Sequence, residues 1–230
     1  MGMNRLNLPP SRLIALAAAA GLVVGALAVY VTNAPQGNGG GAVAQADRAC
    51  EAKTELARIV GETSTGEVAA LLAADPPRSL ADLAFNDPQG APMTLGDLAG
   101  KLTLVNLWAT WCAPCRAEMP ALDALQREMG GEDFEVVAVN VDTGSDDKPK
   151  AFLAETGVDA LAYYRDNTLG LFNELKKRSL ALGLPVTLLV DGDGCLLAHM
   201  NGPAEWNSAD ARRLISSVLA RSEPRSDPSM

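Results

Sequence analysis

The stretch LTLVNLWATWCAPCRAEMP, residues 102–120, decides the fold. Its first seven residues form an apolar run that is too short for a helix and predicts a buried β-strand. A Cys-x-x-Cys pair, Cys112 and Cys115, follows within a few residues, and a helical pattern then covers residues 117–129. A dithiol at the start of a helix, directly after a buried strand, is typical of redox-active sites.

The chemistry of thiol–disulfide exchange accounts for this spacing. The reaction needs a thiolate that forms near neutral pH and a second thiol within bonding reach. At a helix N-terminus, the free backbone N–H groups and the helix dipole stabilise such a thiolate. We therefore expect Cys112 to be the exposed nucleophile and Cys115, one turn into the helix, to be the shielded resolving thiol. Pro114 fits the first turn, where a missing N–H costs little.

A zinc site and a structural disulfide are the two other uses of such a pair. Zinc normally needs a second pair of ligands at matching spacing. The remaining cysteines, Cys50 and Cys195, stand alone, and the chain has one histidine, His199. The redox interpretation therefore fits these residues better than either alternative.

Between residues 79 and 221 the surrounding pattern predicts two short strands followed by the order β-α-β-α-β-α-β-β-α. Strands are predicted over residues 82–86, 91–94, 102–108, 134–141, 160–164, 186–190 and 195–200. Helices are predicted over residues 117–129, 149–155, 169–177 and 208–220. Alternating strands and helices followed by a hairpin favour an α/β fold, a mixed β-sheet flanked by helices on both faces.

The N-terminal region has a different character. Residues 13–31 carry no charge over 19 positions, which matches the roughly 20 apolar residues that span a bilayer. Arg5 and Arg12 precede this run without an acidic residue, so the positive-inside bias predicts a cytoplasmic segment over 1–12 and an exported remainder. A cleaved signal peptide is one alternative, because residues 44–46 form a small-x-small sequence, and a buried cytosolic helix is the other. Both exported interpretations place the domain in an oxidising compartment.

Composition assigns the remaining segments. Residues 32–45 contain proline and a run of three glycines, which predicts a flexible linker. Residues 46–78 predict a helical extension with a break at Gly61 and a further helical turn or two over 67–74. The polar residues 222–230 predict a disordered tail.

Charge and composition exclude several classes of function. The 230-residue chain has 19 basic and 28 acidic residues, a net charge of −9, so a basic nucleic-acid-binding surface is not expected. Aromatic residues make up only 4%, which also argues against base stacking. Four cysteines are too few for a disulfide scaffold. The sequence has no flavin- or nucleotide-binding motif, so we expect no bound cofactor.

The WCxPC segment and the later sequence GLPVT, residues 183–187, together resemble the thioredoxin superfamily, and more closely its membrane-tethered TlpA/ResA branch. The resemblance covers about residues 79–221 and implies a thioredoxin fold there. It also implies that Pro185 is cis and lies against the dithiol, where it shapes the groove in which a partner chain pairs. From the residues alone, Pro185 is equally an ordinary proline at the start of a strand.

Four further residues near the dithiol invite an interpretation. Thioredoxin has an aspartate six residues before its first cysteine, where this chain has Asn106, which cannot accept a proton from Cys115. We expect Glu118 to supply the base, because it lies one turn after Cys115 and the ResA branch similarly has a glutamate at this offset. A solvated helix charge is the alternative. Trp111 is expected to shield the dithiol or else to be a packed aromatic, and Trp108 to lie in the core.

The two spare cysteines, Cys50 and Cys195, lie far apart in the sequence. In an exported protein two such cysteines most often pair. A bridge would join the helical extension to the turn at 191–195 and stabilise the fold by up to ~5 kcal/mol through the unfolded chain. Free or intermolecular cysteines are the alternative.

Together these observations predict a periplasmic thiol–disulfide oxidoreductase, anchored in the bacterial inner membrane through residues 13–31. The resemblance implies reduction of cytochrome biogenesis partners, such as apocytochrome c or copper-site proteins of cytochrome oxidase. It also implies re-reduction by a DsbD- or CcdA-like membrane protein. That the protein reduces its partners, and does not oxidise them, is implied by the resemblance alone, because the Ala-Pro dipeptide between the cysteines does not fix the redox potential. The alternatives are a disulfide-forming oxidant of the same fold, a copper-binding chaperone using Cys112, Cys115 and His199, and a docking module with a vestigial dithiol.

Overall fold

The computed structural model describes residues 38–222 of the chain. The predicted anchor over residues 13–31 lies outside the described residues, and of the predicted tail only Ser222, the last residue of a helix, is described. No helix in this described part is long and apolar enough to cross a membrane.

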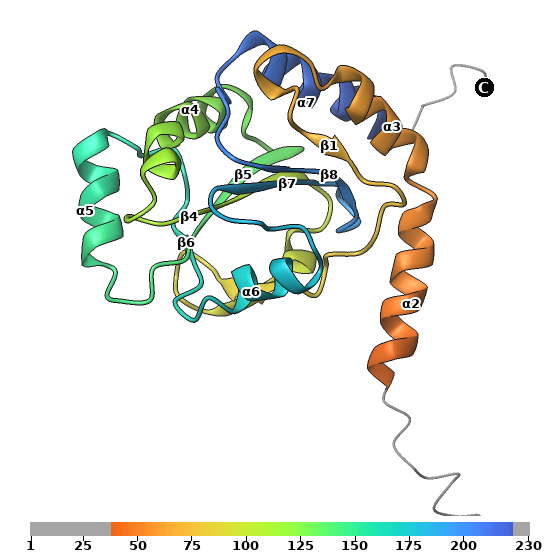
Figure 1. The fold of residues 1–230 in the computed structure, drawn as a ribbon, viewed down its shortest axis with the longest axis horizontal. Helices are drawn as coiled ribbons and strands as arrows, with labels where there is room; N and C mark the ends of the chain where they lie inside the picture. Colours follow the sequence, from red (N-terminus) through yellow and green to blue (C-terminus); the bar gives the residue numbers. More distant parts are fainter. Residues whose placement is uncertain (1–37, 223–230) are drawn as a thin grey trace, which may run out of the picture. The chain divides into compact units, whose positions relative to one another are not determined.

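A mixed sheet of eight strands forms the centre of the domain, in the order β1-β8-β7-β4-β5-β6-β2-β3 (Figure 1). The β4–β5 and β5–β6 pairs are parallel, and the other pairs are antiparallel. The strands are β1 (Leu72–Ala73), β2 (Ala84–Asn86), β3 (Pro92–Thr94), β4 (Leu102–Trp108), β5 (Phe134–Asn140), β6 (Tyr164–Arg165), β7 (Val186–Val190) and β8 (Leu196–Asn201). The predicted α/β fold with a mixed sheet is confirmed.

Helices cover both faces of this sheet. They are α2 (Asn38–Glu51), α3 (Thr54–Thr63), α4 (Ala113–Met129), α5 (Asp147–Thr156), α6 (Gly170–Lys177) and α7 (Ala209–Ser222), with short 3-10 helices η1 (Gly66–Val68) and η2 (Leu95–Leu98). Figure 1 shows α3, α4 and α7 on one face and α6 on the other. Ser208 caps α7 as predicted, because its Oγ accepts the backbone N–H of Ala211 at 3.1 Å.

The two central strands match the apolar runs that predicted them. Every residue of β4 and of β7 is buried, and both strands have their predicted bounds. They pair antiparallel, with Leu107 opposite Val186. The C-terminal end of β4 and the N-terminal end of β7 therefore meet at one edge of the sheet, which brings the two motif segments together.

The N-terminal extension differs from its prediction. Helix α2 begins at Asn38, inside the segment 32–45 predicted as a linker, because the alanine-rich sequence after the glycines favours a helix that extends back through them. Gly61 lies within α3 and does not end it. A Cβ at this position would lie 3.1 Å from the Cβ of Ala73, so the glycine lets α3 approach β1 closely. Residues 67–74 are not helical throughout, because Leu72 and Ala73 pair with the edge of β8.

Two boundaries in the main domain differ from their predictions by a full four residues, and others differ by one or two. Helix α4 begins at Ala113, four residues before the predicted start, because Cys112 caps it. Strand β6 is shorter than the predicted strand over 160–164. The backbone N–H groups of Ala160 and Leu161 donate instead to the carboxylate of Asp123, at 2.7 and 3.2 Å, and so are not free to join the sheet.

Candidate active site

The dithiol lies at the N-terminal end of α4, directly after β4. Cys112 is the residue before the helix, and its Sγ accepts a hydrogen bond from the backbone N–H of Cys115 at 3.3 Å. The two cysteines are joined by a disulfide, with their Cα atoms 5.3 Å apart. In the reduced protein, this N–H group and the helix dipole would stabilise a thiolate on Cys112.

The two sulfurs differ in accessibility. Cys112 is 6% exposed and Cys115 is fully buried. The expectation of an exposed Cys112 is therefore wrong, because both cysteines are buried, although Cys112 is the more accessible of the two.

The segment before β7 lies at the same edge of the sheet. The Leu184–Pro185 peptide bond is cis, as the resemblance implied. Pro185 directly precedes Val186, which pairs with Leu107 near the end of β4. The carbonyl oxygen of Pro185 accepts the N–H of Gly202 at 2.9 Å, so the segment is fixed on its other side as well.

A buried carboxylate fixes the turn between β4 and the dithiol. Asp142, which follows β5, accepts the backbone N–H and the side-chain O–H of Thr110, both at 2.9 Å. Asn140 Nδ2 donates to the same carboxylate at 2.8 Å. Asp142 was not predicted as a site residue, although the parallel neighbours β4 and β5 must end at the same edge of the sheet. This carboxylate positions the residues that carry the nucleophile.

Glu118 lies one turn after Cys115 on α4 and is 3% exposed. Its Oε1 accepts a hydrogen bond from Asn106 Nδ2 at 2.8 Å. Its Oε2 accepts two, from the backbone N–H of Ala204 and from Trp206 Nε1, both at 3.1 Å. The alternative in which Glu118 is a solvated helix charge is therefore wrong.

Burial raises the pKa of Glu118 to about 7, because the charged carboxylate loses its solvation. The N–H donors of Asn106, Ala204 and Trp206 oppose this effect, because they stabilise the ionised form. A carboxyl group whose pKa lies near neutrality can both accept and release a proton under ordinary conditions.

Asn106 connects Glu118 to the strand that follows Pro185. Its Nδ2 donates to Glu118 and also to Thr187 Oγ1, at 2.9 Å. Asn106 is fully buried, and among the described residues its Oδ1 has no hydrogen-bond partner. The polar chain from Glu118 through Asn106 to Thr187 thus joins α4, β4 and β7.

The family model described as Redoxin matches residues 76–215, more than half of the chain. The chain belongs to the Redoxin family. The dithiol, Glu118 and Pro185 all lie within the matched range.

Named relatives within this family support the resemblance to ResA-type proteins. The Redoxin chain is 40% identical over 122 residues to the thiol:disulfide interchange protein HelX of Rhodobacter capsulatus, over 51% of this chain and 63% of HelX. It is 28% identical over 116 residues to the thiol-disulfide oxidoreductase ResA of Bacillus thuringiensis subsp. konkukian, over 50% of this chain and 64% of ResA. These matches span less than two thirds of either relative.

A solved structure supports the thioredoxin-like fold of the Redoxin domain. A protein from Chlorobium tepidum, described as a DsbE-type thiol:disulfide interchange protein, has 26% sequence identity and a TM-score of 0.52. The likeness covers 61% of this chain and 95% of the other.

Trp111 of the Redoxin domain is 66% exposed, so the interpretation as a packed aromatic is wrong. It lines an open groove of about 800 Å³ together with Arg116, Lys148 and Phe152. The Arg116 guanidinium lies over the Phe152 ring, 5.0 Å from its centre. The exposed indole is available to a partner chain, whereas Trp108 is 1% exposed and belongs to the core as predicted.

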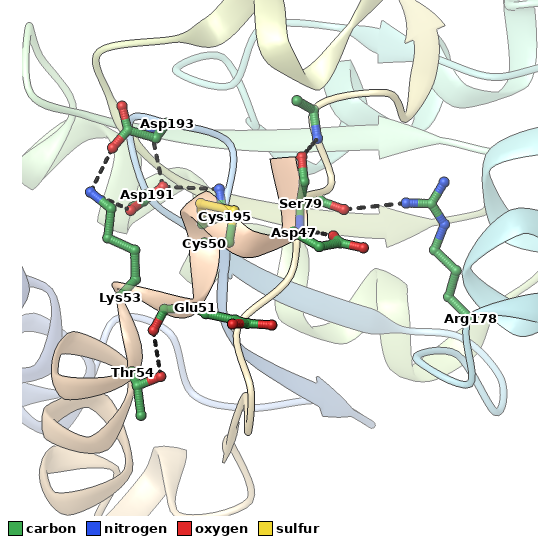
Figure 2. The surroundings of a disulfide bond; sticks show 11 residues. Asp47, Cys50, Glu51, Lys53, Thr54, Ser79, Arg178, Asp191, Asp193 and Cys195 are labelled. Carbon is green, nitrogen blue, oxygen red and sulfur yellow. Dashed lines mark hydrogen bonds and ion pairs between the residues drawn. A yellow bond between two sulfur atoms is a disulfide. The ribbon is translucent and has the colours of Figure 1, made fainter. Parts of the chain in front are cut away.

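Cys50 and Cys195 form a second disulfide, as predicted (Figure 2). It joins α2 to the residue before β8, and each cysteine is 2% exposed. Lys53 Nζ lies 2.5 Å from the Asp193 carboxylate and 3.3 Å from that of Asp191. Asp191 also accepts the backbone N–H of Cys195 at 2.9 Å. Hydrogen bonds and ion pairs thus surround this buried bridge.

The alternative copper site required a third ligand beside the dithiol. His199 lies on β8, where its Cα is paired with those of Leu72 on β1 and Leu188 on β7. Within residues 38–222, no group of three or more His, Cys, Asp or Glu side chains is arranged to hold a metal ion.

Proposed function

We propose that this chain is a thiol–disulfide oxidoreductase that works through the Cys112–Cys115 dithiol. The observation that carries the proposal is the placement of the pair at the N-terminus of α4, with the accessible sulfur at the helix cap and the buried one inside it. The names of HelX and ResA point to the same activity.

The proposed reaction has two exchange steps. The Cys112 thiolate attacks a partner disulfide, the partner's S–S bond breaks, and one partner sulfur leaves as a thiolate that takes a proton from solvent. Cys115 then gives its proton to the Glu118 carboxylate and attacks the Cys112 sulfur. The second partner sulfur leaves, so the partner gains two electrons and the Cys112–Cys115 disulfide forms. The structure holds the dithiol in this oxidised state.

We place this reaction on the periplasmic side of a bacterial inner membrane, with residues 13–31 as the anchor. The Cys50–Cys195 bridge supports an oxidising compartment, because cytosolic reductants keep most thiols reduced. The partners would be disulfides of cytochrome biogenesis proteins, such as apocytochrome c or copper-site proteins of cytochrome oxidase. A membrane thiol reductant of the DsbD or CcdA type would restore the dithiol.

Trapping tests this proposal most sharply. In Cys115→Ser the resolving thiol is gone, so Cys112 should remain joined to its partner in a mixed disulfide. Isolation from a periplasmic extract under non-reducing conditions should recover this conjugate, and Cys112→Ser should recover none. If Cys115→Ser accumulates no conjugate, the proposed nucleophile or the activity itself is wrong.

The direction of electron flow needs its own measurement. Wild-type protein that reduces insulin faster than Cys112→Ser, and whose dithiol is more reducing than glutathione, would support a reductant. A dithiol more oxidising than glutathione would favour the disulfide-forming alternative instead.

A further inference from the structure

Trp206 is a buried aromatic residue that the proposed reaction does not use directly. It lies between β8 and α7 and is fully buried, yet its indole N–H does not go unpaired. It donates to Glu118 Oε2 at 3.1 Å, across 88 residues of sequence. The backbone N–H of Ala204 donates to the same oxygen. One short segment therefore supplies both hydrogen bonds to this half of the carboxylate.

The arrangement sets two opposing effects on Glu118. Burial favours the neutral carboxylic acid, while each N–H donor favours the carboxylate. Asn106 holds Oε1, and the segment of residues 204–206 holds Oε2. A substitution can remove the indole N–H of Trp206 but not the backbone N–H of Ala204. Trp206 is therefore the donor whose effect on Glu118 can be tested.

We propose that Trp206 is a positioning residue for the exchange reaction: its indole N–H holds the Glu118 carboxylate ionised and oriented, ready to take the proton of Cys115. This inference rests on the proposed function, because Glu118 acts there as the base. The proton leaves the Cys115 sulfur for a Glu118 oxygen, and no electron moves in this transfer.

No charged side chain competes with Trp206 for control of Glu118 among the described residues. The groups that contact the carboxyl are Asn106 from β4 and Ala204 and Trp206 from the segment before α7. Cys115 lies one turn before Glu118 on α4 and titrates only in the reduced protein. Thr187 on β7 acts only through Asn106. Glu205, although next to Trp206, is exposed.

The test compares two variants that each lose a buried indole N–H, of which only one donates to Glu118. Trp206→Phe loses the donor to Glu118. Trp108→Phe is the matched control, because Trp108 is equally buried but its Nε1 has no hydrogen-bond partner among the described residues. In the oxidised protein, the carboxyl ¹³C shift of Glu118 should titrate about one to two pH units higher in Trp206→Phe than in wild type. Trp108→Phe should titrate as wild type does.

A kinetic readout separates positioning from mere packing. The rate at which a Cys112 mixed disulfide with a model peptide resolves should rise with pH through the Glu118 transition. In Trp206→Phe the midpoint of this transition should move to higher pH by the same shift, about one to two units. At pH values above the shifted midpoint, the variant should resolve the mixed disulfide as fast as wild type does. A packing defect would instead lower the rate at every pH.

Two outcomes would overturn the inference: a Glu118 titration unchanged in Trp206→Phe, or an equal shift in Trp108→Phe. If Trp206→Phe does not fold, benzothienylalanine at position 206 keeps the ring shape and replaces the N–H with sulfur, so the same shift is expected. The NMR titration needs no turnover. The wild-type protein could therefore lack exchange activity while Trp206→Phe still shifts the pKa of Glu118. That result would contradict the proposed function but not the effect of Trp206 on Glu118.

Discussion

The molecule holds two disulfides of equal span in opposite surroundings. In both, the Cα atoms are 5.3 Å apart. The Cys112–Cys115 pair joins residues three positions apart at a helix N-terminus, where a thiolate is stabilised. The Cys50–Cys195 pair joins segments 145 residues apart, and both its sulfurs are buried.

The groups around each pair explain the division of labour. Beside the near pair stands a buried carboxyl that can exchange protons, Glu118. Beside the far pair stands an ion pair of Lys53 with two aspartates, which holds the bridge in place and offers no proton relay. Accessibility and the neighbouring acid, rather than the geometry of the disulfide, distinguish a bond that exchanges from a bond that supports the fold.

The largest expected effect comes from removing the nucleophile. Cys112→Ser should lower the rate of insulin reduction by at least about a thousandfold, because no other accessible thiol can start the exchange. The double variant Cys50→Ser/Cys195→Ser is the matched control and should keep its rate within about twofold of wild type. A similar loss of rate in Cys112→Ser and in the double variant would show that the two pairs do not differ in function.

The same double variant should show the next largest effect, this time on stability. Loss of a bridge that closes a loop of 145 residues should lower the free energy of unfolding by about 2–5 kcal/mol. Urea unfolding with the dithiol held oxidised measures this change. An unchanged midpoint would mean that the far pair does not support the fold.

The ionisation of Glu118, the acid beside the near pair, should make the free energy of unfolding depend on pH. The folded pKa of Glu118, about 7, lies above the ordinary value of 4.5, so the folded protein binds this proton more tightly than the unfolded chain does. The free energy of unfolding should therefore fall as pH rises from about 4.5 to 7, by up to about 3 kcal/mol from this group. Urea unfolding at several pH values should show this slope in wild type and a flatter one in Glu118→Gln. Parallel slopes would assign the titration to another group.

The smallest effect concerns the ion pair beside the far disulfide. Lys53→Ala should lower the free energy of unfolding by about 1–2 kcal/mol, because Asp193 is largely exposed but the buried Asp191 carboxylate loses its cation. Lys101→Ala, which removes a comparable pair with Glu135, is the control. Only Lys53→Ala should also speed the reduction of Cys50–Cys195 by dithiothreitol. Equal reduction rates in both variants would show that the ion pair does not guard the bridge.

The sequence pattern predicted correctly the elements whose structure depends mainly on neighbouring residues. The apolar runs of β4 and β7 specified those strands to the residue, because both are buried on either face. The WCxPC and GLPVT segments located the dithiol and the cis proline. The strand β1 was missed, since Leu72 and Ala73 sit in a stretch with high helix propensity and become a strand only by pairing with β8.

The parts of the site that escaped prediction depend on distant contacts. Trp206 meets Glu118 across 88 residues, and no spacing in the sequence indicates this pairing. Asp142 holds the turn before Trp111 through Thr110, which is a contact between the residues that follow β4 and those that follow β5. The sequence thus indicated the reacting atoms, whereas the residues that tune them emerge only when the sheet is assembled.

Differential alkylation of the two pairs tests the central claim most directly. The folded protein is equilibrated with increasing dithiothreitol, quenched with acid, and then denatured and alkylated, so that buried thiols are labelled too and mass spectrometry quantifies the reduced fraction of each cysteine. Cys112 and Cys115 should become labelled together at low reductant, while Cys50 and Cys195 should stay unlabelled unless denaturant is present during the reduction. Labelling of Cys50 and Cys195 at the same reductant concentration, or before the near pair, would contradict it.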